Sequence, residues 1–133
     1  MQRNTAPSLR LVALDDNPFE LESLAHALQT PGRPHAEATF TQTIAAFLAE
    51  VARLDPDVVT IDVDLGLDDA TGLDVIGAAR RLAPRAFICM CSSDASPQTM
   101  RDALGLGADD YLVKGTLPDD LGAFFAQARS SRS

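Results

Sequence analysis

The sequence predicts an α/β domain in which a doubly wound, five-stranded parallel sheet carries helices on both faces. Two observations predict this fold class. Short apolar runs rich in β-branched residues alternate five times with segments of helical periodicity. The third and fourth runs are continuously apolar, as strands covered on both faces are. A chain of 133 residues, 46% of them hydrophobic, is enough for one core and one domain.

The first unit combines a strand over residues 9–14 with a helix that runs from Pro18 to about residue 29. Asn17 is a favourable N-cap residue, and proline fits the first turn of a helix. The proline-rich and glycine-containing segment 30–34 ends that helix.

The second and third units follow the same pattern. Residues 35–40 alternate in polarity like an outer strand, and residues 41–54 carry a helical stripe. The stripe consists of Ile44, Phe47, Leu48 and Val51. A central strand is expected at residues 57–61, followed by an acidic loop and a helix over residues 72–82.

The fourth and fifth units complete the sheet. A strand is expected at residues 86–91, and the next helix opens at Ser96 and Pro97 and ends at Gly105 and Gly107. The last strand covers residues 110–113, and the last helix begins near residues 117–120. The apolar face of this helix consists of Leu121, Phe124, Phe125 and Ala128.

We expect residues 9–129 to form the domain, between a flexible N-terminal segment (1–8) and a flexible C-terminal tail (130–133). The formal net charge of -8 argues against a broad attraction to nucleic acid or to an anionic membrane surface. No apolar run approaches membrane-spanning length, so the expected location is cytoplasmic. Cys89 and Cys91 would point to the same face of a strand, and we expect both to be reduced core residues.

Polar residues follow the predicted strands at the edge where parallel sheets bind ligands. They are Asp15, Asp16, Asp62, Ser92, Ser93 and Lys114. Neighbouring carboxylates repel one another, and a hard cation bound through oxygen offsets that repulsion. Mg²⁺ fits better than zinc because neither His26 nor His35 falls at this edge.

Lys114 is the only lysine of the chain, and its ammonium suits a site that receives a phosphate group. The hydroxyl of Ser92 can donate to a phosphoryl oxygen. Each residue also has a structural explanation, because acidic pairs and serines often cap helices and most lysines are solvated. Their joint placement at successive strand ends favours the site.

These residues resemble those of response regulator receiver domains, the chemotaxis-regulator-like switches of two-component signal transduction. The resemblance rests on the pair Asp15 and Asp16, on PDVVTID ending at Asp62, on ICMCSS, and on GADDYLVK ending at Lys114. It covers residues 9 to about 128. It implies a flavodoxin-like (βα)5 fold with strand order 2-1-3-4-5.

The resemblance also implies a role for each matching residue. Asp62 is the phosphoacceptor, Asp16 binds Mg²⁺ directly, and Asp15 acts largely through water. Asp64 matches the position whose backbone carbonyl completes the metal site. Ser92 and Lys114 contact the phosphoryl group. Tyr111 matches the aromatic residue whose rotamer changes with the position of the Ser92 hydroxyl.

As a receiver, the chain is expected to take its phosphoryl group from a sensor histidine kinase or a phosphotransfer protein. It would act as a switch whose own chemistry is limited to self-phosphorylation and autodephosphorylation. The added charge would draw Ser92 and Lys114 inward and allow Tyr111 to turn. The face of the fourth helix, fifth strand and fifth helix would report this change to a partner or to an output domain outside this chain, and it is a candidate homodimer surface.

The sequence departs from the family pattern in three respects. Gly66 and Gly115 stand where prolines are common, and the stretch from Asp62 to Gly72 is about two residues longer than usual. Two alternatives follow. One is a degenerate receiver that acts as an interaction module without phosphorylation. The other is a phosphatase of the haloacid dehalogenase type, because Asp62 and Asp64 resemble the paired aspartates of that family. In that family, however, the pair follows the first strand, whereas here it follows the third.

Overall fold

The computed structural model describes residues 9–28, 36–63, 72–93, 96–114, 124–125 and 127–128. Its centre is a parallel sheet of five strands in the order β2-β1-β3-β4-β5. The strands are β1 (Leu9–Leu14), β2 (Ala36–Thr41), β3 (Val58–Asp62), β4 (Phe87–Ser92) and β5 (Asp110–Val113). The helices between them are α1 (Pro18–Leu28), α2 (Ile44–Leu54), α3 (Gly72–Leu82) and α4 (Pro97–Gly105). The predicted fold class and strand order are confirmed.

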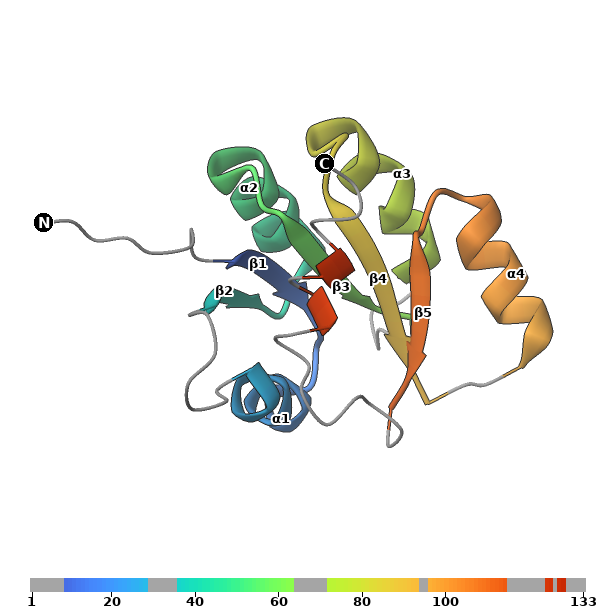
Figure 1. The fold of residues 1–133 in the computed structure, drawn as a ribbon, viewed down its shortest axis with the longest axis horizontal. Coiled ribbons are helices and arrows are strands. Elements are labelled where there is room, and N and C mark those ends of the chain that lie inside the picture. The colour runs from blue at the N-terminus through green and yellow to red at the C-terminus, as the bar shows by residue number, and fades with distance from the viewer. Residues whose placement is uncertain are drawn as a thin grey trace, which may run out of the picture.

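Helices cover both faces of the sheet, so the core has two halves (Figure 1). On one face, α2, α3 and α4 pack through residues such as Phe47, Ile76 and Ala103. On the other face lie α1 and the short helical stretch that includes Phe125. Every residue of β3 is buried, as a central strand flanked by helices on both sides must be.

The last predicted helix is described only in part. Residues 124–125 and 127–128 are helical, and Phe124 and Ala128 pack beside the fully buried Phe125. Phe124 and Phe125 contact each other edge to face, with ring centroids 5.5 Å apart. The remainder of this helix, the chain ends and the helix-ending segment 30–34 lie outside the described residues.

Two predicted boundaries are wrong at the start of α2. Thr41, expected to begin this helix, ends β2 instead, and its hydroxyl donates to the carbonyl of Ala13 at 2.6 Å. Thr43 is the true N-cap, since its side chain accepts a hydrogen bond from the Ala46 amide at 3.2 Å. The predicted stripe still faces the core, with Phe47 and Val51 fully buried.

Strands β3 and β4 each extend one residue further than predicted, and the extra residues are Asp62 and Ser92. Both are polar yet buried, and both have a strand partner across the sheet: Asp62 lies opposite Cys91 and Ser92 opposite Val113. The parallel ladder therefore continues past the apolar run and fixes the backbone of the two polar residues. Hydropathy alone placed the strand ends too early.

Helix α4 begins and ends as predicted. Ser96 is its N-cap, with Pro97 in the first turn. At the other end Gly107 has φ +119°, and the amides of Gly107 and Ala108 donate to the carbonyls of Leu104 and Ala103. This is the double hydrogen-bond pattern of a Schellman motif, which needs a residue without a side chain at Gly107.

Arg80, in the last turn of α3, joins three segments at the amino edge of the sheet. Its guanidinium donates to the carbonyls of Pro84, Ala86 and Gly107 and, at 2.7 Å, to Asp109. The same Asp109 oxygen accepts from the Ile88 amide at 2.9 Å. Arg80 therefore ties α3 to the start of β4 and to the connection before β5.

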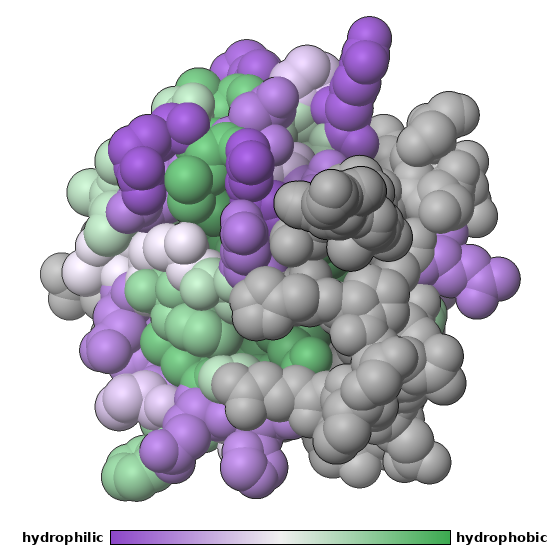
Figure 2. Space-filling view, turned by 60° about the vertical axis from the view of Figure 1, so that its left-hand side comes forward, coloured by the Kyte–Doolittle hydropathy of each residue, from purple (hydrophilic) through white to green (hydrophobic). Residues whose placement is uncertain are grey.

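Apolar side chains also reach the surface. Figure 2 shows a hydrophobic area near the middle of the face that it presents, with hydrophilic side chains above it, below it and to its left. The large exposed hydrophobic residues of the described chain are Phe19, Phe40, Leu82, Leu104 and Leu106. None of the described helices has the length and apolar character to cross a membrane.

We predict that Arg80→Met lowers the free energy of unfolding by about 2 to 4 kcal/mol, because it leaves part-buried carbonyls and the Asp109 carboxylate without their charged donor. Arg81→Met is the matched control, since Arg81 lies in the same helical turn but is exposed. Urea denaturation measures both. Equal stability of the two variants would contradict the role assigned to Arg80.

Candidate functional site

The first acidic residue, Asp15, follows β1 and is held by the backbone. Its amide donates to the carbonyl of Thr41 at 3.1 Å, and its carboxylate accepts from the Asn17 amide at 2.9 Å. Asn17 in turn caps α1, with its side chain accepting from the Phe19 amide at 2.9 Å. Asn17 is thus the predicted cap, and Asp15 keeps its second carboxylate oxygen for other partners.

The second strand end contributes Asp62, whose side chain is only 3% exposed. The next residue continues the ladder, because the Val63 amide donates to the carbonyl of Cys91 at 3.0 Å. A carboxylate at this depth is costly unless charges or hydrogen bonds compensate it. The compensation comes from the neighbouring groups of the site.

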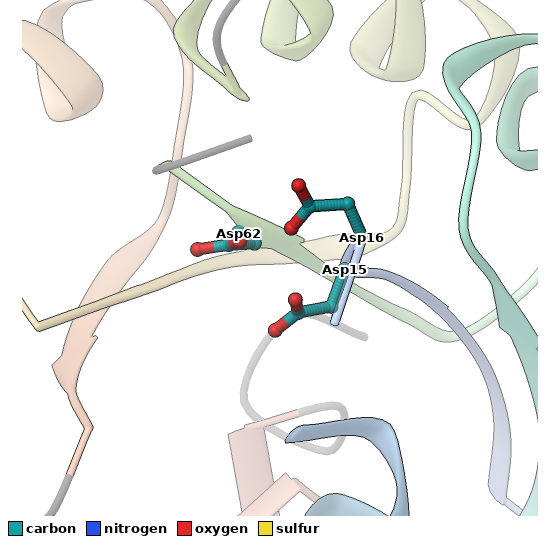
Figure 3. A group of neighbouring side chains, drawn as sticks. All are labelled: Asp15, Asp16 and Asp62. Atoms are coloured by element: carbon teal, nitrogen blue, oxygen red, sulfur yellow. The ribbon is translucent and has the colours of Figure 1, made fainter. Parts of the chain in front are cut away.

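Asp15, Asp16 and Asp62 form one cluster at the carboxyl edge of the sheet (Figure 3). Each offers a carboxylate oxygen, and these oxygens all lie within 4.8 Å of one another. Mg²⁺ binds oxygen ligands at about 2.0–2.1 Å, so opposite ligands of its octahedron stand about 4 Å apart. The donor set and the spacing therefore fit a hard divalent cation after a small closure.

Lys114 stands beside this cluster as its counter-charge. Its ammonium donates to Asp15 at 3.0 Å and to Asp62 at 3.2 Å, so a residue at the end of β5 joins the ends of β1 and β3. Its amide donates to the carbonyl of Ser92 at 2.8 Å, which positions the residue just after β5. Burial lowers the pKa of this ammonium, but its hydrogen bond to Asp15 and the charge of Asp62 more than offset that effect, so the pKa is raised. Lys114 is charged across the neutral range.

Ser92 and Tyr111 occupy one face of the sheet. Ser92 is fully buried at the end of β4, and Tyr111 is buried on β5 opposite Met90. Because Met90 and Ser92 are two residues apart on one strand, Ser92 and Tyr111 point toward the same layer, the one that holds α4. Ser93, the other serine of the pair, is exposed. Neither serine is the N-cap of α4, since Ser96 is.

The structure thus brings together Asp15, Asp16, Asp62 and Lys114, with Ser92 at the adjoining strand end. Asp64, Gly66 and Gly115 lie outside the described residues, and so do His35 and the acidic loop. His26 is exposed on α1 and lies apart from the acidic cluster.

Sequence reasoning missed Glu20, in the first turn of α1. Its carboxylate lies 3.8 Å from the Lys114 ammonium. No local signal in the sequence marks this contact, because it depends on how α1 packs against the sheet. Glu20 also lines a cavity of about 200 Å³, together with Asp15, Asp62, Lys114, Leu24 and Cys91.

The two cysteines differ, although both were expected in the core. Cys89 is fully buried, whereas Cys91 is half-buried and lines the cavity. The core assignment of Cys91 was therefore wrong: the residue lies opposite Asp62, one position before the polar end of β4, and borders the cavity. A hydrogen bond with Cys91 and burial raise the pKa of the Cys89 thiol well above its usual value. Both thiols are free, as predicted.

We predict that iodoacetamide modifies Cys91 at least about tenfold faster than Cys89 in the native protein, because the thiolate is the reactive form and Cys89 is both buried and protonated. Peptide mass spectrometry after timed quenching measures the two rates. In urea-unfolded protein the two cysteines should react alike, and faster labelling of Cys89 in the folded state would refute the assignment.

A parallel sheet in the order 2-1-3-4-5, with an acidic cluster and a lysine at its carboxyl edge, defines a class of α/β switch domains. The response regulator receiver domain family matches residues 11–125, and the chain belongs to this family. It is therefore a receiver domain of the two-component type, a signalling switch. Family membership decides against the dehalogenase-type alternative.

Two relatives illustrate the similarity. The photosynthetic apparatus regulatory protein RegA of Rhodovulum sulfidophilum is 37% identical over 117 residues, which cover 88% of this chain and 60% of that protein. The transcriptional regulatory protein KdpE of Mycobacterium tuberculosis is 34% identical over 122 residues, covering 91% of this chain and 50% of that protein. The chain thus spans about 50 to 60% of the length of these relatives.

Solved structures share the fold. The receiver domain protein from Methanospirillum hungatei superposes with a TM-score of 0.80 at 24% identity, covering 95% of this chain and 97% of that one. A response regulator from Burkholderia pseudomallei, solved with a phosphorylated aspartic acid, a calcium ion and citrate, gives a TM-score of 0.74 at 23% identity, covering 95% and 74% of the two chains.

Proposed function

We propose that this receiver is phosphorylated on Asp62 in the presence of Mg²⁺, and that the phosphoryl group comes from a sensor histidine kinase or a phosphotransfer protein. One observation carries the proposal. The Lys114 ammonium reaches both Asp15 and Asp62, and three carboxylate oxygens converge beside it. The acids can hold a cation, and the ammonium can meet an arriving anion.

In the transfer step a carboxylate oxygen of Asp62 attacks phosphorus and forms a new P–O bond. The bond from phosphorus to the donor atom breaks, and its electron pair leaves with the donor, which is the imidazole nitrogen when a phosphohistidine is the donor. Lys114 neutralises charge on the equatorial oxygens as they pass. Asp15, Asp16 and Asp62 would hold Mg²⁺, with the backbone carbonyl of Asp64 as a fourth ligand, and this ion supplies further neutralisation of the phosphoryl charge.

The response to phosphorylation follows from the sheet. Phosphorylation adds about 1.5 to 2 negative charges and new acceptor oxygens at the end of β3. Ser92, one strand over, can donate its hydroxyl to one of them. Any shift of Ser92 changes the space on the face that it shares with Tyr111 and α4, which makes this the expected path to a partner.

The wider setting is also part of the proposal. The relatives are regulatory proteins longer than this chain. We therefore propose that this receiver acts with an output domain outside this chain and in the cytoplasm. The phosphorylated aspartic acid and bound cation of the Burkholderia pseudomallei regulator support the same chemistry here. The surface of α4, β5 and the last helix is the proposed partner or homodimer face, with no direct role in binding nucleic acid.

We expect the protein to gain one phosphate when it is incubated with acetyl phosphate and Mg²⁺, and Asp62→Asn to gain none, because the amide is too weak a nucleophile. Intact mass spectrometry measures the addition of about 80 Da. Asp74→Asn, in the first turn of α3, controls for loss of an acid elsewhere. Modification of Asp62→Asn would show that the phosphoacceptor is another residue, and an unmodified native protein would favour the interaction module.

Bound Mg²⁺ should raise the free energy of unfolding of the native protein. The increase is about 2.7 kcal/mol when the free Mg²⁺ concentration is one hundred times the dissociation constant. Thermal unfolding with and without MgCl₂ measures this effect. Asp16→Asn removes one carboxylate of the cluster, so we expect most of the stabilisation to disappear. A melting temperature that responds to Mg²⁺ equally in both proteins would place the cation elsewhere.

A further inference from the structure

We propose that Glu20 is a positioning residue that competes with the phosphoryl group for the Lys114 ammonium. This competition sets how fast Asp62 is phosphorylated. This inference rests on the proposed function and deepens it. Glu20 is outside the set of residues that the family resemblance assigns to the site. It reaches the site from α1, a different element from those that supply the acids and the lysine.

The geometry gives Lys114 three carboxylate neighbours. Asp15 and Asp62 accept its hydrogen bonds at 3.0 and 3.2 Å, and Glu20 stands at 3.8 Å, an ion-pair distance longer than a hydrogen bond. The side chains of Lys114 and Glu20 are 22% and 37% exposed and face the same cavity. An ammonium has three donors, so Glu20 can take the one that the two aspartates leave.

Charge determines what this placement does. The site holds one ammonium and four carboxylates, those of Asp15, Asp16, Glu20 and Asp62, so its formal charge sums to -3. A further negative charge favours the arrival of a cation and opposes the arrival of an anion. When a cation occupies the acids and a phosphoryl group arrives, Glu20 remains as a competitor for Lys114 on the side of α1.

Glu20 therefore has opposite effects on two steps. It strengthens cation binding, both by its own charge and by drawing Lys114 away from Asp15 and Asp62. It slows phosphoryl transfer from an anionic donor for two reasons. Its charge repels the donor, and its ion pair with Lys114 competes with the phosphoryl oxygens for the ammonium. A residue that served only the stability of α1 would change both steps in the same direction or neither.

The test compares Glu20→Gln with Glu22→Gln, which removes the same charge from an exposed position two residues along the same helix and outside the cavity. Mg²⁺ affinity is measured by isothermal titration calorimetry. The rate of phosphorylation by acetyl phosphate is measured by intact mass at saturating Mg²⁺. We expect Glu20→Gln to bind Mg²⁺ about threefold more weakly and to be phosphorylated about threefold to tenfold faster, with Glu22→Gln close to the native protein.

A conservative variant separates charge from shape. Glu20→Asp keeps the charge on a shorter side chain, so its Mg²⁺ affinity should stay within about twofold of the native value and its rate should lie nearer to the native protein than to Glu20→Gln. Raising the salt concentration should make the Mg²⁺ affinity and the phosphorylation rate of Glu20→Gln more similar to those of the native protein, since screening weakens the effect of a part-exposed charge.

The outcomes are distinguishable. If the native protein is phosphorylated on Asp62 but Glu20→Gln matches Glu22→Gln, or changes both quantities in the same direction, the role of Glu20 is overturned and the proposed function stands. If the native protein takes no phosphate while Asp62→Asn behaves identically, the proposed function fails and the inference fails with it.

Discussion

The ion pairs of Lys114 with Asp15 and Asp62 are the constraint on which the carboxyl edge of this sheet depends. They join residues 99 and 52 positions apart in the chain, and they offset the burial of an acid that is nearly inaccessible to water. Without the ammonium, the clustered carboxylates would repel one another across less than 5 Å. The same pairing keeps the positive charge beside the expected phosphoacceptor, so one arrangement serves both folding and chemistry.

The two edges of the sheet divide these tasks. At the amino edge the two terminal nitrogens of Arg80 donate hydrogen bonds to three carbonyls and to Asp109. At the carboxyl edge Lys114 is held by fewer and longer contacts, and a cavity adjoins it. A guanidinium has a rigid fork of donors, whereas an ammonium is a compact charge that can change partners. Arginine therefore suits the fixed contacts at the amino edge, and lysine suits the carboxyl edge, where the partners of the charge can change.

The sequence predicted the fold and most of the site because both follow from local patterns. Apolar runs identified all five strands, and polar residues after them identified Asp15, Asp62, Ser92 and Lys114. Errors arose where the pattern has no local signature. Thr41 has a hydroxyl bonded across strands, and Glu20 meets Lys114 only through the packing of α1 on the sheet. Neither contact can be deduced from hydropathy, since each depends on how separate elements dock.

Lys114 is the single lysine of the chain, and this has a practical consequence for spectroscopy. In a ¹⁵N-lysine-labelled sample every side-chain ammonium signal comes from one Nζ atom, so it needs no assignment. That atom is bonded to Asp15 and Asp62 and lies near Glu20. Its chemical shift and its exchange with water would therefore follow every change of partner in solution, in real time and without a foreign label.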